Sequence, residues 1–104
     1  MSTQTTIFAS GETAIDTIDL AMLAAGWNDT GEPLTYEDAQ FLTEVAAMLH
    51  RLYYDVCPDG YPGVFAYEVS ECLGRELAPR PERELAFAER TARAWIVTEL
   101  ERKA

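Results

Sequence analysis

The hydrophobic positions of this chain recur at three- and four-residue steps in four segments, a pattern typical of amphipathic helices. The clearest segment runs from Thr35 to about Asp55, with Thr35 as the N-cap and acidic residues in the first turn. Its predicted buried stripe comprises Phe41, Leu42, Val45, Leu49, Leu52 and Val56. No segment alternates for long enough to predict a strand, so the pattern predicts an all-α protein.

Two further helices are predicted in the second half of the chain. The first spans Val64 to Leu77, and its core face comprises Phe65, Val69, Cys72, Leu73 and Leu77. The second spans Glu82 to Arg102, and its buried stripe comprises Leu85, Ala88, Ala92, Trp95, Ile96 and Leu100. Short joints rich in Pro and Gly separate the helices, so we expect a compact four-helix bundle. Its length fits a single domain over residues 1–104, with residues 1–11 as a candidate flexible N-terminus.

The remaining helix is predicted from Glu12 to Ala25, with Ser10 as N-cap and Gly26 as the C-terminal stop. Its expected core arc comprises Ala14, Ile15, Ile18, Ala21, Met22 and Ala25, and its acidic stripe comprises Glu12, Asp16 and Asp19. Leu20, Leu23 and Trp27 fall beside the acids rather than within the arc. Two interpretations stay open for these three side chains: an interface for a partner, or burial, either under the following linker or against a second layer of the bundle.

Charge is divided unevenly along the chain. The first fifty residues hold eight carboxylates and no Lys or Arg, whereas the rest holds ten carboxylates and eight bases, so the formal charges are −8 and −2. An acidic protein is repelled by nucleic acid and by anionic membranes, which favours a basic protein surface as the partner. An acidic solubility coat is the competing explanation. The candidate partner-binding residues are Glu12, Asp16, Asp19, Trp27, Asp29, Glu32, Glu37 and Glu44.

Candidate catalytic and metal-binding residues are sparse. His50 is the only histidine and lies at the boundary of its helix's core stripe, so we expect it near Tyr53 or Tyr54 rather than in a triad. Asn28, Asp29 and Glu32 lack the spacing of a calcium-binding loop. Cys57 and Cys72 match neither a redox pair nor a zinc site, so we expect reduced thiols. The predicted protein is therefore no enzyme and takes no cofactor or metal; a small hydrolase with an unrecognised site is the weakest alternative.

The joint over residues 57–63 is a second candidate binding feature. Pro58, Gly60, Pro62 and Gly63 could hold Tyr61 and Phe65 in a defined place at the start of a helix. Alternatively, Tyr61 caps the end of the bundle. The sequence also shows no targeting segment and no apolar run long enough to span a bilayer, so we expect a cytoplasmic protein that binds no membrane.

In its compact, acidic, single-domain character the chain resembles the small type I anti-CRISPR proteins of phages and mobile elements. The segment over residues 60–69, GYPGVFAYEV, is distinctive but matches no known site, so no functional residue is carried over. The resemblance implies a non-enzymatic inhibitor in the bacterial host cytoplasm that covers a basic surface of a Cascade subunit or of the Cas3 nuclease. The alternative function is a small host regulatory or assembly module that binds a protein partner through an apolar groove. Either protein could be a monomer or a homodimer.

Overall fold

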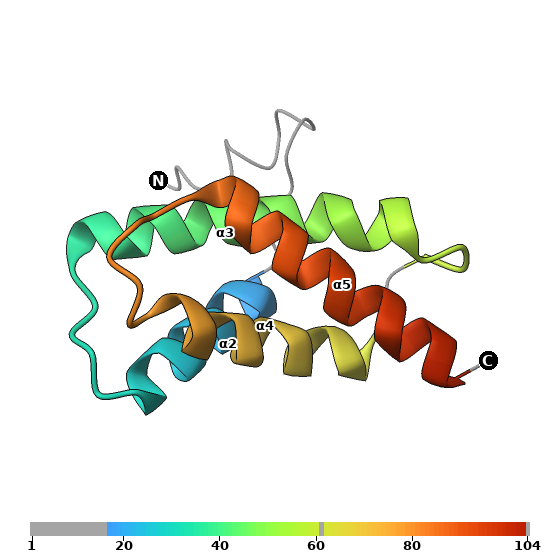
Figure 1. Cartoon of the computed structure of the whole chain (residues 1–104), viewed down its shortest axis with the longest axis horizontal. Helices are drawn as coiled ribbons and strands as arrows, with labels where there is room; N and C mark the ends of the chain where they lie inside the picture. Colours follow the sequence, from blue (N-terminus) through green and yellow to red (C-terminus); the bar gives the residue numbers. More distant parts are fainter. Residues whose placement is uncertain (1–16, 61, 104) are drawn as a thin grey trace.

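The computed structural model describes residues 17–60 and 62–103, which form four helices and, within these ranges, no strand (Figure 1). The helices are α2 (Thr17–Asp29), α3 (Tyr36–Val56), α4 (Val64–Leu77) and α5 (Leu85–Lys103). Helix α2 packs against α4 and α3, α5 packs against α3 and α4, and α3 touches α4 only slightly. This arrangement confirms the predicted all-α four-helix bundle. The candidate flexible N-terminus lies outside the described residues.

Helix α3 forms where the sequence predicts it. The Thr35 hydroxyl accepts a hydrogen bond from the Asp38 backbone N–H (3.1 Å), and the Asp38 carboxylate accepts one from the Thr35 N–H (3.5 Å). These two bonds form a capping box, which satisfies N–H groups that the first turn of a helix leaves without partners. The predicted stripe is confirmed, with Val56 half-buried and the rest fully buried: Phe41, Leu42, Val45, Leu49 and Leu52.

Helices α4 and α5 also follow their predicted patterns, with two differences. Cys72 is exposed rather than in the core, because it faces the open side between α4 and α5. Helix α5 begins at Leu85 rather than Glu82, since the Glu84 carbonyl accepts a bond from the Ala88 N–H (3.2 Å) at the start of the helix. The buried stripes are otherwise confirmed at Phe65, Val69, Leu73, Leu77, Ala88, Ala92 and Ile96, with Leu85, Trp95 and Leu100 partly buried.

The predicted core face of the first helix is wrong. Ala14 and Ile15 lie outside the described residues, and of the rest of the arc Ile18 is 47% exposed, Ala21 and Ala25 are exposed, and Met22 is half-buried. The buried face of α2 instead comprises Asp19, Leu23, Gly26 and Trp27. These positions are spaced i, i+4, i+7 and i+8, so they form one helical face. The helix also continues through Gly26 to Asp29 instead of stopping at the glycine.

Gly26 has a packing role, because α2 and α4 meet backbone to backbone. A Cβ atom on Gly26 would collide with the Glu71 carbonyl oxygen and lie 2.9 Å from the Arg75 nitrogen. A Cβ on Gly74 would collide in turn with the Leu23 carbonyl oxygen. Both glycines are therefore required at this crossing, and their position fixes which face of α2 turns inward.

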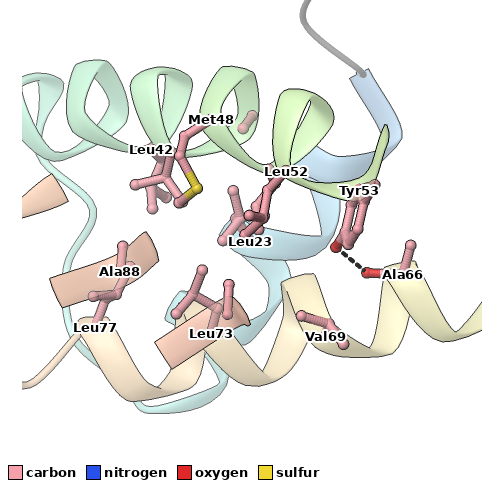
Figure 2. Packing of buried hydrophobic residues seen from close by; sticks show 14 of the residues in the cluster. Leu23, Leu42, Met48, Leu52, Tyr53, Ala66, Val69, Leu73, Leu77 and Ala88 are labelled. Carbon is pink, nitrogen blue, oxygen red and sulfur yellow. Dashed lines mark hydrogen bonds between the residues drawn. The ribbon is translucent and has the colours of Figure 1, made fainter. Parts of the chain in front are cut away.

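A buried polar network lies at the same crossing. The Ser70 hydroxyl of α4 lies 3.1 Å from the Asp19 carboxylate and 3.0 Å from the Ala66 carbonyl, and the Tyr53 hydroxyl of α3 donates to that carbonyl at 2.9 Å. Figure 2 shows Tyr53 reaching across to Ala66 among the packed leucines. Hydrogen bonding offsets the free-energy cost of removing these polar groups from water.

An ion pair anchors the connection between α4 and α5 to the start of α3. Arg83 Nε donates to the Asp38 carboxylate at 2.8 Å, and the Arg83 guanidinium lies 4.7 Å from the centre of the Trp27 ring. The hydrogen bond from Arg83 is the main cause that lowers the pKa of Asp38 below its ordinary value. One arginine thus ties three elements together at this end of the bundle.

Replacing Gly26 with alanine should destabilise the protein. Helix propensity alone would raise stability by about 1 kcal/mol, but the collision at α4 should lower the free energy of unfolding by about 2–3 kcal/mol. Urea unfolding measures the difference. The neighbouring exposed Ala25→Gly, which loses only propensity, should lower stability by about 1 kcal/mol. A Gly26→Ala protein more stable than the wild type would show that the helices do not meet here.

Replacing Asp38 with asparagine should destabilise the protein by roughly 1 kcal/mol at pH 7. Because the pKa of Asp38 is lowered on folding, its charge stabilises the fold above the ordinary value of 3.8, and this contribution is lost as pH falls through the folded-state pKa. The unfolding free energies of wild type and variant should therefore converge as the pH falls below the folded-state pKa of Asp38. Arg83→Lys, which keeps the charge but loses the planar donor, is the matched control. A difference that persists in acid would contradict the electrostatic origin.

Candidate functional site

The structure divides the eight predicted partner-binding residues into three groups. Glu12 and Asp16 lie outside the described residues. Asp19 and Trp27 are 0% exposed, so their prediction as surface residues is wrong. Asp19 lies against Ser70 at the helix crossing, and Trp27 packs in the core with its Nε1 donating to the Pro33 carbonyl at 3.4 Å. Burial is thus the correct interpretation for Trp27 and Leu23, while Leu20 is partly buried.

The other four predicted residues are exposed and lie along the start of α3 and the connection before it. Asp29 ends α2, Glu32 lies in the connection, Glu37 is in the first turn of α3, and Glu44 follows about two turns later. Glu37 and Glu44 are seven residues apart, so they share a helical face about 10 Å along the axis from each other. We call Glu32, Glu37 and Glu44 the acidic surface.

Arginines from the second half of the chain neutralise some acids of the first half but not the acidic surface. Arg75 of α4 pairs with Asp29 at 3.2 Å and with Glu71 at 3.0 Å, and the hydrogen bond to Asp29 is the main cause that raises the pKa of Arg75. Arg83 neutralises Asp38 in the same way. The lopsided charge of the sequence is therefore reduced by pairs that span distant helices.

The acidic surface keeps its charge. Among residues 17–60 and 62–103, Glu32, Glu37 and Glu44 belong to no ion pair, and all three are exposed. These carboxylates can therefore form ion pairs with basic side chains of a partner. Among the described acids of the first half, the exposed and unpaired carboxylates are therefore those of Glu32, Glu37 and Glu44.

Two exposed apolar side chains lie among these acids, and the sequence analysis did not single them out. Tyr36 is 78% exposed, with its hydroxyl accepting a bond from Gln40 Nε2 at 3.3 Å, and Leu34 is 37% exposed. Tyr36 lies nearly opposite the core stripe of α3 by helical phasing, so the same periodicity that predicted the core could have identified it. By helical phasing Tyr36 lies about 90° from the face that Glu37 and Glu44 share, so it is an exposed aromatic at the edge of the acidic surface, the composition of an interface anchor.

The other candidates contribute less to this site. Tyr61 lies outside the described residues, and Phe65 is buried. His50 is a half-buried boundary residue with its ring 5.2 Å from that of Tyr54, as predicted. Both cysteines are free; Cys57 is buried, which raises the pKa of its thiol.

Metal-binding and membrane-spanning features were also sought in the described ranges. No group of three or more His, Cys, Asp or Glu side chains there is arranged to hold a metal ion. None of the helices in the same ranges has both the length and the apolar character that crossing a membrane requires.

Comparison of the chain with protein-family models, with curated proteins and with solved structures finds no match.

Proposed function

We propose that the protein works without catalysis, by binding a basic surface of a protein partner through the acidic surface and Tyr36. The observation that carries the proposal is the contrast between neighbouring acids. Asp29 and Asp38 are paired with arginines, whereas Glu32, Glu37 and Glu44 are exposed and belong to no ion pair among the described residues. Unpaired carboxylates beside an exposed tyrosine match a partner that offers Lys or Arg beside an apolar pocket.

Charge and the tyrosine would contribute at different stages of binding. Carboxylates on the surface attract a basic groove over roughly 10 Å at 0.1 M salt, so they mainly raise the association rate. An aromatic side chain buried on contact mainly slows dissociation, because its burial is lost only when the complex separates. Carboxylates spaced along a helix can also occupy a groove that otherwise holds phosphates.

The resemblance to type I anti-CRISPR proteins gives the proposal its most specific form. The partner would then be a DNA-binding groove of a Cascade subunit or the surface through which Cas3 is recruited, and the protein would block target binding or nuclease recruitment. Purified Cascade and Cas3 are the first partners to test. If neither is bound, a pull-down from the native host identifies the basic partner to use instead.

Charge reversal of the acidic surface should slow association. We expect Glu32→Lys with Glu44→Lys to lower the association rate at least about tenfold at low salt and to flatten its salt dependence, since steering is lost. Surface plasmon resonance measures both, and circular dichroism checks the fold. The matched control is Asp59→Lys with Glu101→Lys, which makes the same charge change on exposed residues of the connection after α3 and of the last turn of α5. These two segments lie at the opposite end of the bundle from the start of α3 (Figure 1). Equal slowing by both pairs, or salt-independent binding, would contradict the proposal.

Removal of the Tyr36 ring should shorten the lifetime of the complex. We expect Tyr36→Ala to raise the dissociation rate about 30-fold, equivalent to about 2 kcal/mol, while the salt dependence of association stays unchanged. Because Tyr36 is 78% exposed, the melting temperature should stay near that of the wild type. Tyr54→Ala, at the other end of α3 and 56% exposed, is the control. An unchanged dissociation rate in Tyr36→Ala would show that the tyrosine is not an anchor.

A further inference from the structure

A groove between the first half of α4 and the second half of α5 is a second surface feature, separate from the acidic surface. It has a volume of about 340 Å³ and is lined by apolar groups of Phe65, Val69, Cys72 and Trp95. Phe65 and Val69 are anchored in the core and Trp95 is half-buried, so the floor is held in place before any ligand arrives. We call this feature the α4–α5 groove.

The lining residues define the length of the α4–α5 groove. Those of α4 run from Phe65 to Cys72 and those of α5 from Trp95 to Arg102. Each run covers eight residues, a rise of about two helical turns or roughly 10 Å. Two turns of a third helix could lie along this length and insert side chains at i, i+4 and i+7, as in other helix-in-groove complexes.

The rim of the groove carries a negative charge. Glu68 on the α4 side is exposed and forms no ion pair within the described residues, while Glu99 on the α5 side pairs with Arg102 at 2.8 Å. Two acids and one base leave a net charge of −1 around the apolar floor. A complementary ligand therefore has an apolar face with a basic flank that passes Glu68.

We propose that the α4–α5 groove binds a basic amphipathic helix of a protein partner. Such a site would serve the proposed protein-binding function without depending on the acidic surface. It is also the site that a small regulatory or assembly module with an apolar groove would use. A second copy of the chain fits less well. Its α5 surface at Arg90, Ala94 and Val97 also carries Glu89, which pairs with Arg93 and reduces the basic character that Glu68 would attract.

The probe is a synthetic helical peptide with leucines at i, i+4 and i+7 and lysines along one flank. Two matched peptides replace the leucines with serine or the lysines with glutamate. The readout is the rate at which N-ethylmaleimide modifies Cys72, which is exposed in the groove, with buried Cys57 as an internal reference. We expect the leucine–lysine peptide at saturation to slow Cys72 modification at least tenfold without changing Cys57, and both matched peptides to have little effect.

Two charge-reversal variants distinguish the groove from general attraction to an acidic protein. Glu68→Lys should weaken peptide affinity about tenfold, whereas Glu76→Lys, the same change on an exposed acid of α4 outside both the groove and the acidic surface, should weaken it less than twofold. Equal weakening by both variants, or equal protection by the glutamate peptide, would overturn the proposal. Protection of Cys72 without peptide that grows with protein concentration would overturn it in favour of a second copy. Protection by a small apolar amine but not by the peptide would overturn it in favour of a small ligand.

The two proposals can fail independently. Loss of partner binding in Glu32→Lys with Glu44→Lys, together with no peptide protection of Cys72, would leave the acidic surface as the one binding site. Protection of Cys72 by the peptide, together with unchanged partner binding in that double variant, would leave the α4–α5 groove as the one binding site.

Discussion

The backbone contact between α2 and α4 controls the arrangement of the rest of the molecule. Gly26 and Gly74 each lie against a carbonyl oxygen of the opposite helix, so neither position accepts a side chain. This contact sets the rotation of α2 about its axis. It thereby turns Leu23 and Trp27 into the core, and it brings Asp19 against Ser70. The contribution of α2 to the core and the buried polar network at the crossing both follow from that rotation.

The same packing decides which charges stay available at the surface. Once α2 and α4 are in contact, Arg75 reaches Asp29, and the connection to α5 brings Arg83 to Asp38. Among the described acids of the first fifty residues, Glu32, Glu37 and Glu44 thus stay exposed and outside any ion pair. The function we propose depends on these three carboxylates and on Tyr36, rather than on the total charge of the protein.

The sequence was informative where one helical face is clearly apolar. Helices α3 and α4 have such faces, and their bounds and most of their core residues were predicted from periodicity. Helix α2 carries apolar residues on nearly every side, so its hydrophobic pattern does not select a face. Contact with Gly74, far along the chain, decides which face of α2 is buried. The ion pairs of Arg75 with Asp29 and of Arg83 with Asp38 also join residues that are distant in the sequence. No local pattern reports such contacts, which is why Asp19 and Trp27 were assigned to the surface.

The most direct measurement of the central claim is hydrogen–deuterium exchange of the protein, free and bound to its partner. The account predicts slower exchange on binding over residues 30–44, which carry the acidic surface and Tyr36, with residues 65–72 of the α4–α5 groove protected in addition if a basic helix occupies it. Protection confined to other parts of the chain, with exchange over residues 30–44 unchanged, would contradict the account.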